Sequence, residues 1–340
     1  MSGSDPAEAV ARALSFLKAA QQPDGGFLNQ FQYADQDPIL VANVFPAALI
    51  AHCLSFSPAG RSVTERALDF LAAEASKEGV WSHFSSSQLD QEFLPPDVDD
   101  TACASAALRQ GCRPVPDNEA LMLANRDRRG LFYTWFTFRP RWSGLAHWRL
   151  VWPQHRHLAT LWPLFTRTTS SIYNVDAAVN ANVLFYLGER PETAAIRPYL
   201  LKILEEGSEE TCDTWYPSKY QIWYFVARAL QGDPAAERLL RAALDRVSPV
   251  TPLEAALAQC TRFYVGLPPS GALRDLLIST QTPSGAWGVE CVYHGLNCWW
   301  GSEAMTTAFA VEALSRDQAA LQGDLGKAQI SRCESGAGPR

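Results

Sequence analysis

Residues 38–54 read PILVANVFPAALIAHCL and contain no Asp, Glu, Lys or Arg, and residues 63–76 follow with VTERALDFLAAEAS. In the second stretch apolar residues recur every three to four positions between charged ones, which is typical of a helix with one wet face. The uncharged stretch predicts a helix that is buried on all sides. Together the two stretches predict an inner helix packed against an outer one.

The same alternation runs through the rest of the chain. The amphipathic segments are 7–21, 63–76, 117–125, 194–206, 234–246 and 272–281. The apolar segments are 38–54, 99–109, 175–187, 220–230, 252–265 and 302–314. Six outer and six inner helices in strict alternation predict an all-α protein, an (α/α)6 double-ring helical barrel formed by one domain over residues 1–316. Residues 317–340 are polar and Gly-rich, so we expect a disordered tail.

A weak repeat lies in the turns between these segments. Gln21, Gly25 and Phe27 share the spacing Gln-x3-Gly-x-aromatic with residues 281–287, and residues 79–81 keep the Gly-x-Trp half. A Gln side chain can bind backbone groups at a helix end while the ring stacks over the turn. We therefore expect a structural staple between outer helices.

Residues 126–173 form an insertion that is too long for a simple loop, so we expect short helices within it. From Arg126 to Arg167 there are eight Arg and one Asp without Lys or Glu, a net charge of +7, and five of the eleven Trp. Arg interleaved with Trp suits the entrance of a site, an anionic head group or a membrane surface, although a packed loop with solvated Arg explains it as well. Arg139 and Arg141, with Lys219 further on, are candidate contacts for a diphosphate or a carboxylated ring.

Other features bear on partners and location. The net charge of −7 argues against nucleic acid as a partner. No apolar stretch reaches the roughly 20 residues of a membrane span, and no signal-peptide pattern opens the chain. We expect a cytoplasmic monomer that makes peripheral membrane contact, if any, through residues 126–173.

Three carboxyl groups gather in Asp97-Val98-Asp99-Asp100-Thr101, at the start of an apolar segment. Taken alone, residues 97–100 fit a helix N-cap and first turn, where carboxylates complement the helix dipole. The alternative is chemical. A carboxyl group crowded by others in an apolar setting stays protonated near neutral pH and can act as an acid.

These residues carry a family resemblance. Asp97-Val98-Asp99-Asp100-Thr101-Ala102 resembles the Asp-x-Asp-Asp-Thr-Ala acid motif of squalene-hopene cyclases and class II diterpene cyclases, whose central Asp is the proton donor. Residues 281–291 are similar to the hopene cyclase stretch in which the Trp repeat runs on into Gly, acidic residues and Cys. Residues 180–184 resemble the segment whose His hydrogen-bonds the catalytic Asp. Asn182 stands in place of that His, as Asn does in diterpene members of the class.

The resemblance implies a class II terpene cyclase, an isomerase or intramolecular lyase that needs no cofactor. Asp99 would protonate a terminal alkene or epoxide of a prenyl chain, Asp97 and Asp100 would hold its proton and geometry, and Asn182 would hydrogen-bond its other oxygen. The match covers residues 1–316 and is closest to single-domain cyclases of the merosterolic acid synthase type. The substrate would be hydrophobic: a prenylated aromatic compound of meroterpenoid biosynthesis, or a C15–C20 prenyl diphosphate, the one case in which Mg²⁺ could take part.

A carbocation cascade needs an electron-rich wall that is not nucleophilic, which aromatic faces provide. Each candidate for this wall is equally at home in a protein core, and their common feature is a place near the start of a predicted inner helix. The candidates are Trp215, Tyr220, Trp223, Trp299, Trp300 and Phe309.

Other readings remain open at this point. Cys291-x2-His294-x3-Cys298 has a spacing that could hold zinc, as in protein prenyltransferases. A glycosidase would need facing carboxylates, for which Asp99 with Asp176 or Glu303 are candidates. The Asp-Asp-x2-Asp motif of class I terpene synthases is absent, since Asp99-Asp100 continues with Thr-Ala-Cys. A non-catalytic toroid that binds a prenyl chain, a lipid or a protein is the remaining class.

Overall fold

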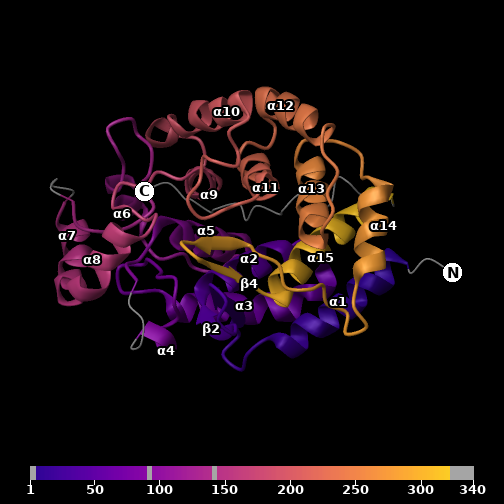
Figure 1. Cartoon of the computed structure of the whole chain (residues 1–340), viewed down its shortest axis with the longest axis horizontal. Coiled ribbons are helices and arrows are strands. Elements are labelled where there is room, and N and C mark those ends of the chain that lie inside the picture. The colour runs from indigo at the N-terminus through magenta and orange to yellow at the C-terminus, as the bar shows by residue number, and fades with distance from the viewer. Residues whose placement is uncertain (1–4, 90–93, 140–143, 322–340) are drawn as a thin grey trace, which may run out of the picture.

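The computed structural model describes residues 5–89, 94–139 and 144–321. This part of the chain is mostly helical, with one small four-stranded sheet (Figure 1). The α-helices are α1 (Pro6–Ala20), α2 (Val44–Leu54), α3 (Arg61–Glu74), α4 (Ser86–Leu89), α5 (Val98–Gln110), α6 (Glu119–Ala124), α7 (Leu145–Val151), α8 (Leu158–Arg167), α9 (Ala177–Leu187), α10 (Ile196–Glu206), α11 (Lys219–Ala229), α12 (Pro234–Leu244), α13 (Pro252–Tyr264), α14 (Gly271–Thr280) and α15 (Glu303–Leu321). The strands are β1 (Phe27–Tyr33), β2 (Ile39–Asn43), β3 (Tyr293–Gly295) and β4 (Cys298–Gly301), and the 3-10 helices are η1 (Pro58–Gly60), η2 (Trp152–His157) and η3 (Pro191–Thr193).

All twelve helices expected from the alternating pattern are present. The amphipathic segments form α1, α3, α6, α10, α12 and α14, and the apolar segments form α2, α5, α9, α11, α13 and α15. Each apolar helix packs against the next along the chain, and α15 packs back onto α2. In Figure 1, α10 and α12 lie outside α9 and α11. Every residue of α2 is buried, as its lack of charge predicts.

The sheet corrects the all-α prediction. Residues 39–43, expected to be helical, form β2, which pairs antiparallel with β1, and the strand order is β2-β1-β4-β3. A short apolar run has the same pattern in a buried strand as in a buried helix, so the sequence alone does not separate them. Trp299 and Trp300, expected near the start of the last inner helix, lie on β4 instead. Strands β2 and β4 lead directly into α2 and α15, which places the sheet at the N-terminal ends of the inner helices.

The repeated turns are staples between outer helices, as predicted. The Gln21 amide donates to the carbonyls of Gly25 (2.9 Å) and Val63 (3.0 Å). The Gln281 amide donates to those of Gly285 (2.9 Å) and Ala9 (2.8 Å), so the turn after α14 is tied to α1. Gly285 has a φ of +88°, and a Cβ there would lie 2.5 Å from the Arg12 carbonyl oxygen, so glycine is required.

The insertion contains the short helices α7, η2 and α8, as expected for a segment of this length. At the other end, α15 continues past residue 316 to Leu321, and Asp317 is fully buried. Residues 317–321, which we predicted to belong to a disordered tail, are therefore helical, and residues 322–340 lie outside the described residues, as does Arg141. Among the helices that the structure describes, none has the length and apolar character to cross a bilayer.

Candidate active site

The acid motif forms the start of α5. Asp97 is the N-cap residue, and its carboxylate accepts a hydrogen bond from the backbone N–H of Asp100 (2.7 Å). The Thr101 hydroxyl donates to the Asp97 carbonyl (2.6 Å), so the first turn is fixed from both sides. The capping role expected of these carboxylates is thus real for Asp97. Asp99, two residues into the turn, is left for other contacts.

Two donors meet the Asp99 carboxyl group. The Asn182 amide of α9 donates to Asp99 Oδ1 (2.6 Å), as the family resemblance implied. The Tyr216 hydroxyl, from the loop before α11, donates to Asp99 Oδ2 (2.6 Å). Because both partners donate, neither consumes the acidic proton of a neutral Asp99. A proton on Asp99 is therefore not committed to either of these two partners.

A buried arginine determines how Asn182 is oriented. The Arg228 guanidinium of α11 donates to Asn182 Oδ1 (2.5 Å). A guanidinium can only donate, so it must face the amide oxygen, and the amide NH₂ group must then face Asp99. Arg228 is 4% exposed, and its guanidinium lies over the rings of Phe185 (4.4 Å) and Phe225 (5.2 Å). The Asn182 amide therefore lies between the positively charged Arg228 and the Asp99 carboxyl group.

The electrostatic balance at Asp99 favours the neutral acid. Burial raises the pKa of Asp99, and the hydrogen bonds from Asn182 and Tyr216 and the charge of Arg228 offset this rise only in part. Asp99 nevertheless keeps some accessible surface, unlike its neighbours Val98 and Asp100. Asp99 is therefore the accessible carboxyl group of the three in the motif.

Asp97 and Asp100 form an acidic pair on either side of Asp99 in the sequence. Burial and the proximity of Asp100 raise the pKa of Asp97 well above its ordinary value. Burial raises the pKa of Asp100 to about 7, and the charge of Asp99 adds to this effect. His83 Nδ1 lies 3.7 Å from Asp100 Oδ2. The pair therefore holds at least one proton near neutral pH.

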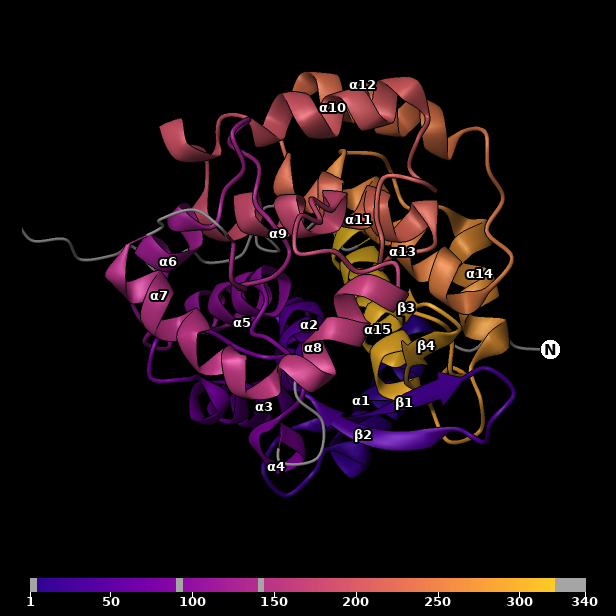
Figure 2. The same ribbon diagram turned by 60° about the vertical axis from the view of Figure 1, so that its left-hand side comes forward.

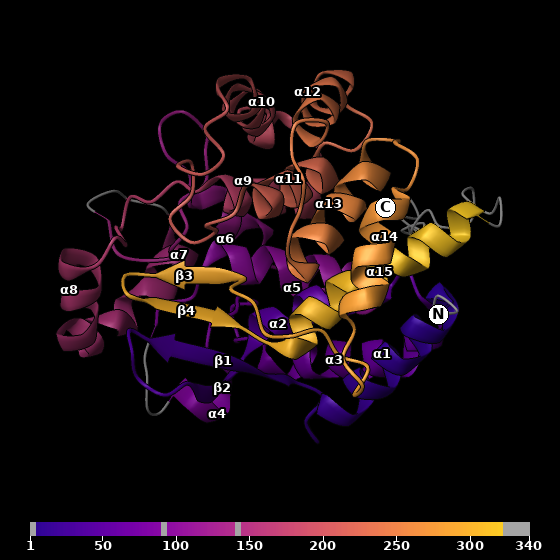
Figure 3. The same cartoon turned by 45° about the vertical axis from the view of Figure 1, so that its right-hand side comes forward.

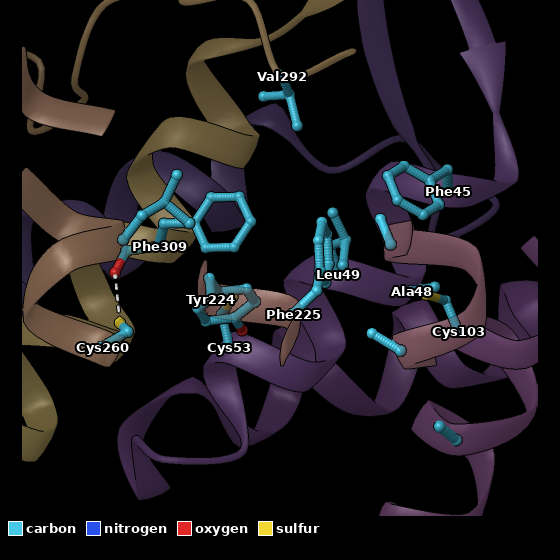
Figure 4. Packing of buried hydrophobic residues seen from close by; sticks show 14 of the residues in the cluster. Phe45, Ala48, Leu49, Cys53, Cys103, Tyr224, Phe225, Cys260, Val292 and Phe309 are labelled. Atoms are coloured by element: carbon cyan, nitrogen blue, oxygen red, sulfur yellow. Dashed lines mark hydrogen bonds between the residues drawn. The ribbon is translucent and has the colours of Figure 1, made fainter. Parts of the chain in front are cut away.

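Aromatic rings continue from Asp99 into the interior. Tyr216 packs on Phe225 (4.9 Å between ring centroids), and Tyr224 packs on Phe225 (5.4 Å) and on Phe309 of α15 (5.3 Å). Phe45 of α2 lies 6.3 Å from Tyr216. Figure 4 shows Phe45, Phe225 and Phe309 directed from three different helices toward a common interior region. Asp99 thus lies at the polar end of a continuous cluster of packed aromatic rings, called the aromatic lining below.

Of the six aromatic residues proposed from the sequence, only Phe309 joins this lining by a ring contact. Trp223 donates to Glu209 (2.9 Å) and packs on Tyr220 (5.3 Å), and neither contact connects them with Asp99. Trp300 stacks on Tyr293 (5.4 Å), close to His83 rather than to Asp99.

The other two predicted residues lie on the sheet and on the adjoining loop. Trp299 pairs with Gln32 and His294 in the sheet. Trp215 packs edge-to-face on Trp135 (5.7 Å), one residue before Tyr216. Trp215 therefore borders the acid site from the side of the insertion.

Tyr216 is held in place by Asp213. The Asp213 carboxylate accepts the backbone N–H groups of Trp215 (2.9 Å) and Tyr216 (3.1 Å), and also that of Ala178 at the start of α9 (2.8 Å). Burial raises the pKa of Asp213 to about 8, and nearby Asp176 adds to the rise. One side chain thus fixes both the loop that carries Tyr216 and the helix that carries Asn182.

The structure separates the residues of the rival readings. Asp176 is buried and accepts hydrogen bonds from Thr134 (2.5 Å) and Thr214 (3.0 Å), so both of its carboxylate oxygens are engaged in holding the fold, and Glu303 is exposed. Across the described ranges, His, Cys, Asp and Glu side chains form no group of three suited to a metal ion, so Cys291, His294 and Cys298 are not gathered into a zinc site.

The two basic candidates among the described residues, Arg139 and Lys219, have partners within the protein. Arg139 is buried and donates to the carbonyls of Ile172 (2.6 Å) and Trp135 (2.8 Å) and to Asn125 (2.7 Å). Lys219 lies 3.4 Å from the Glu210 carboxylate. Arg139 is therefore a structural residue of the insertion rather than a ligand contact.

Sequence reasoning missed Tyr216 and Arg228. Arg228 had a visible signal, because it is the only charged residue between Tyr220 and Leu230, within a segment predicted to be buried on all sides. An arginine in such a segment requires a partner. Tyr216 lies in a loop and has no periodic pattern, so nothing in the sequence distinguishes it from other tyrosines.

No protein-family model matches this sequence, and no curated protein matches it. Solved structures do. A protein from Actinoplanes superposes with a TM-score of 0.65 at 17% identity, over 93% of this chain and all of the other. The type II terpene cyclase MstE from Scytonema superposes with a TM-score of 0.63 at 14% identity, over 92% of this chain and 98% of the other. An MstE variant in complex with its substrate, geranylgeranyl dihydroxybenzoate, gives 0.64 at 14% identity, over 92% and 97%.

At such identities the likeness concerns the fold, and it extends over nearly the full length of each chain. The resemblance seen in the acid motif and the turns therefore has a structural counterpart. This chain has the fold of the type II terpene cyclase MstE.

Proposed function

We propose that this protein is a class II terpene cyclase in which Asp99 protonates the terminal alkene or epoxide of a prenyl chain and starts a carbocation cascade that closes fused rings. The observation that carries the proposal is the Asp99 carboxyl group, which is desolvated, bonded only to donors, and continuous with an aromatic lining. The six apolar helices would form the inner ring of an (α/α)6 barrel within one domain, residues 1–316.

The first step needs a strong acid that is still neutral before the reaction. Burial raises the pKa of Asp99 and so favours its protonated form, and the two donors then stabilise the carboxylate that proton transfer creates. Hydrogen bonds to a charged acceptor contribute about 1.5–3 kcal/mol each, more than those to the neutral acid. Asn182 and Tyr216 therefore lower the barrier, because they bind the product form of Asp99 more strongly than the reactant form.

Arg228 would add to this effect at a distance. Its charge favours the Asp99 carboxylate without a direct ion pair, which would deprotonate the acid in advance. Asp97 and Asp100 would hold the turn and retain protons near the acid.

Protonation of the alkene carbon leaves a carbocation on the neighbouring carbon, and successive ring closures move the charge along the chain. The rings of Tyr216, Phe225, Tyr224 and Phe309 offer π faces along this route, each worth about 0.5–2 kcal/mol to a cation. The final cation is quenched by loss of a proton or by attack of an oxygen nucleophile.

For the substrate we favour a prenylated aromatic compound over a prenyl diphosphate. MstE has been crystallised with geranylgeranyl dihydroxybenzoate as substrate and with merosterolic acid A as product. The same chemistry in this chain is our inference from the shared fold. In addition, the donors of Arg139 are already used within the protein, which weakens the case for a diphosphate clamp.

The test is incubation of the purified protein with geranylgeranylated hydroxybenzoates, farnesyl diphosphate, geranylgeranyl diphosphate and squalene, with and without added Mg²⁺. Chromatography with mass detection should reveal an isomer of the substrate that is less retained. Formation of such an isomer from the aromatic substrates and its loss in Asp99→Asn support the proposal. A folded protein that converts none of the substrates, or an active Asp99→Asn variant, contradicts it.

A further inference from the structure

Exposed apolar side chains concentrate in the insertion. Twelve large hydrophobic residues of the described chain are exposed, and half of them lie between residues 126 and 173: Phe138, Leu145, Trp152, Leu158, Trp162 and Tyr173. Trp152 and Trp162 are 64% and 69% exposed. Tryptophan side chains left in water in this way are typical of surfaces that contact another apolar phase.

The same segment is basic. No Asp or Glu occurs between Arg128 and Asp176, and Arg149, Arg156 and Arg167 are exposed on α7, η2 and α8. The protein as a whole carries −7, so an anionic surface would repel most of the molecule and attract this part. The charge distribution therefore favours one orientation of the protein on an anionic surface, with this segment facing the surface.

The segment also borders the acid site. Phe165 of α8 lies 6.1 Å from Trp135, and Trp135 lies 5.7 Å from Trp215, next to Tyr216. Trp135 also forms a bridge with Asp97, the N-cap of α5. Figure 2 shows α7 and α8 on the near side of the molecule, in front of α5, the helix that carries Asp99.

Four more exposed apolar residues lie at the turns of the sheet: Tyr33, Ile39, Leu40 and Leu296. The two turns are joined by a hydrogen bond from Ala34 N–H to the Asn297 carbonyl (2.7 Å). Figure 3 shows the turn between β3 and β4 on the same side of the molecule as α8. The turn after β1 carries Asp35 and Asp37, so the charge of the insertion, not of this turn, would decide the contact with an anionic surface.

We propose that α7, η2 and α8 form a docking surface for an anionic lipid bilayer, with Trp152 and Trp162 inserted at the interface and Arg149, Arg156 and Arg167 against the head groups. Short amphipathic helices with this combination of residues lie in the plane of the interface. Membrane binding stands by itself. The further step, entry of a prenyl chain from the bilayer beside Trp135 and Trp215, rests on the proposed function.

The test is sedimentation of the full chain with vesicles of phosphatidylcholine alone and of phosphatidylcholine mixed with phosphatidylserine. We expect binding to the mixed vesicles and much weaker binding to the neutral ones. Replacing Arg149, Arg156 and Arg167 by Gln should weaken binding about 100-fold, and Trp152→Ser with Trp162→Ser about tenfold or more. Val250→Ser removes an exposed apolar residue elsewhere (76% exposed) and should leave binding unchanged.

Three results would overturn the inference. The first is failure to bind mixed vesicles, the second is equal binding to both vesicle types, and the third is sedimentation velocity showing that the Trp variants only abolish a dimer. Asp99→Asn separates this inference from the proposed function, because that variant should bind vesicles fully while losing turnover. A protein that converts substrate but does not bind vesicles supports the proposed function and contradicts the docking surface. A protein that binds vesicles but converts no substrate does the reverse.

Discussion

Two carboxyl groups lie buried among the inner helices, and their surroundings move their pKa values in opposite directions. Asp99, near the start of α5, has a raised pKa because burial outweighs its two hydrogen bonds and the charge of Arg228. Burial would also raise the pKa of Glu312, in the middle of α15, but the nearby basic groups His52 and Arg316 and its hydrogen bonds outweigh burial and lower it. Burial alone therefore does not decide whether such a group is charged.

The difference lies in how each cation is placed. Arg316 donates directly to Glu312 (2.9 Å), and the hydroxyls of Tyr224 (2.8 Å) and Tyr264 (3.1 Å) donate to the same carboxylate. Arg228 instead reaches Asp99 only through the amide of Asn182. Direct contact gives Glu312 an ion pair, whereas one intervening amide separates the cation from the Asp99 carboxyl group.

The largest expected effect is on turnover when Asp99 is changed. Asp99→Asn keeps the size of the side chain but removes the proton, and a general acid contributes about 10²–10⁴-fold to a rate. We expect product to fall by about 10³-fold or more, measured by mass detection, while the melting temperature stays close to that of the unchanged protein. Loss of the fold together with activity would mean that Asp99 is structural, like Glu312.

The complementary prediction concerns stability at the other carboxyl group. Glu312→Gln leaves the Arg316 guanidinium buried without its counter-charge, which costs about 3–5 kcal/mol of unfolding free energy. Urea denaturation measures this loss. Glu303→Gln, at the exposed start of the same helix, serves as the control and should change stability by less than about 0.5 kcal/mol. Equal losses in the two variants would refute the structural ion pair.

A smaller effect is expected at Arg228. Arg228→Met keeps a long apolar side chain among the aromatic rings but removes the charge that lowers the pKa of Asp99. The acid then becomes weaker and stays protonated to higher pH. Turnover should therefore fall by about 10- to 100-fold, while the alkaline limb of the pH–rate profile moves upward. Arg316→Met, at the other carboxyl group, should leave the position of that limb unchanged.

The smallest effect is on the pH dependence of stability. The pKa of Asp100 is raised from 3.8 to about 7, so the folded protein keeps a proton that the unfolded chain releases in this range. The unfolding free energy should therefore fall as pH rises through this window, by at most about 1.4 kcal/mol per pH unit for one proton. Asp100→Asn should flatten this slope in denaturant titrations at several pH values. Asp245→Asn, at an exposed position, should not.

The helices could be predicted from the sequence because buried positions recur with the helical period. Each of the twelve segments contains a helix, but residues 39–43 at the start of one of them form a strand, since a run of four apolar residues fits either structure. The turn staples could be predicted from the sequence because Gln, Gly and an aromatic residue at fixed spacing act within a single turn.

The site was only partly predictable. The motif led to Asp99 and Asn182, whose contact is present, because both lie on helices of fixed register. Tyr216 lies on a loop, and its position depends on Asp213 and on α9. No local sequence pattern indicates these contacts. Of the aromatic residues predicted from the sequence, Phe309 is the one in ring contact with the aromatic lining, since nearness in sequence to a helix start does not say which face of a helix a side chain occupies.

The staple at residues 281–287 joins the last outer helix to the first one, and α15 packs against both α1 and α2. During synthesis, the first helices therefore leave the ribosome long before the segments that cover them. Contacts between such distant parts of a chain form slowly, because a long loop must close before they are made. Folding of this domain should therefore finish only after α15 has been released, and until then the apolar surface of α2 depends on other protection against aggregation.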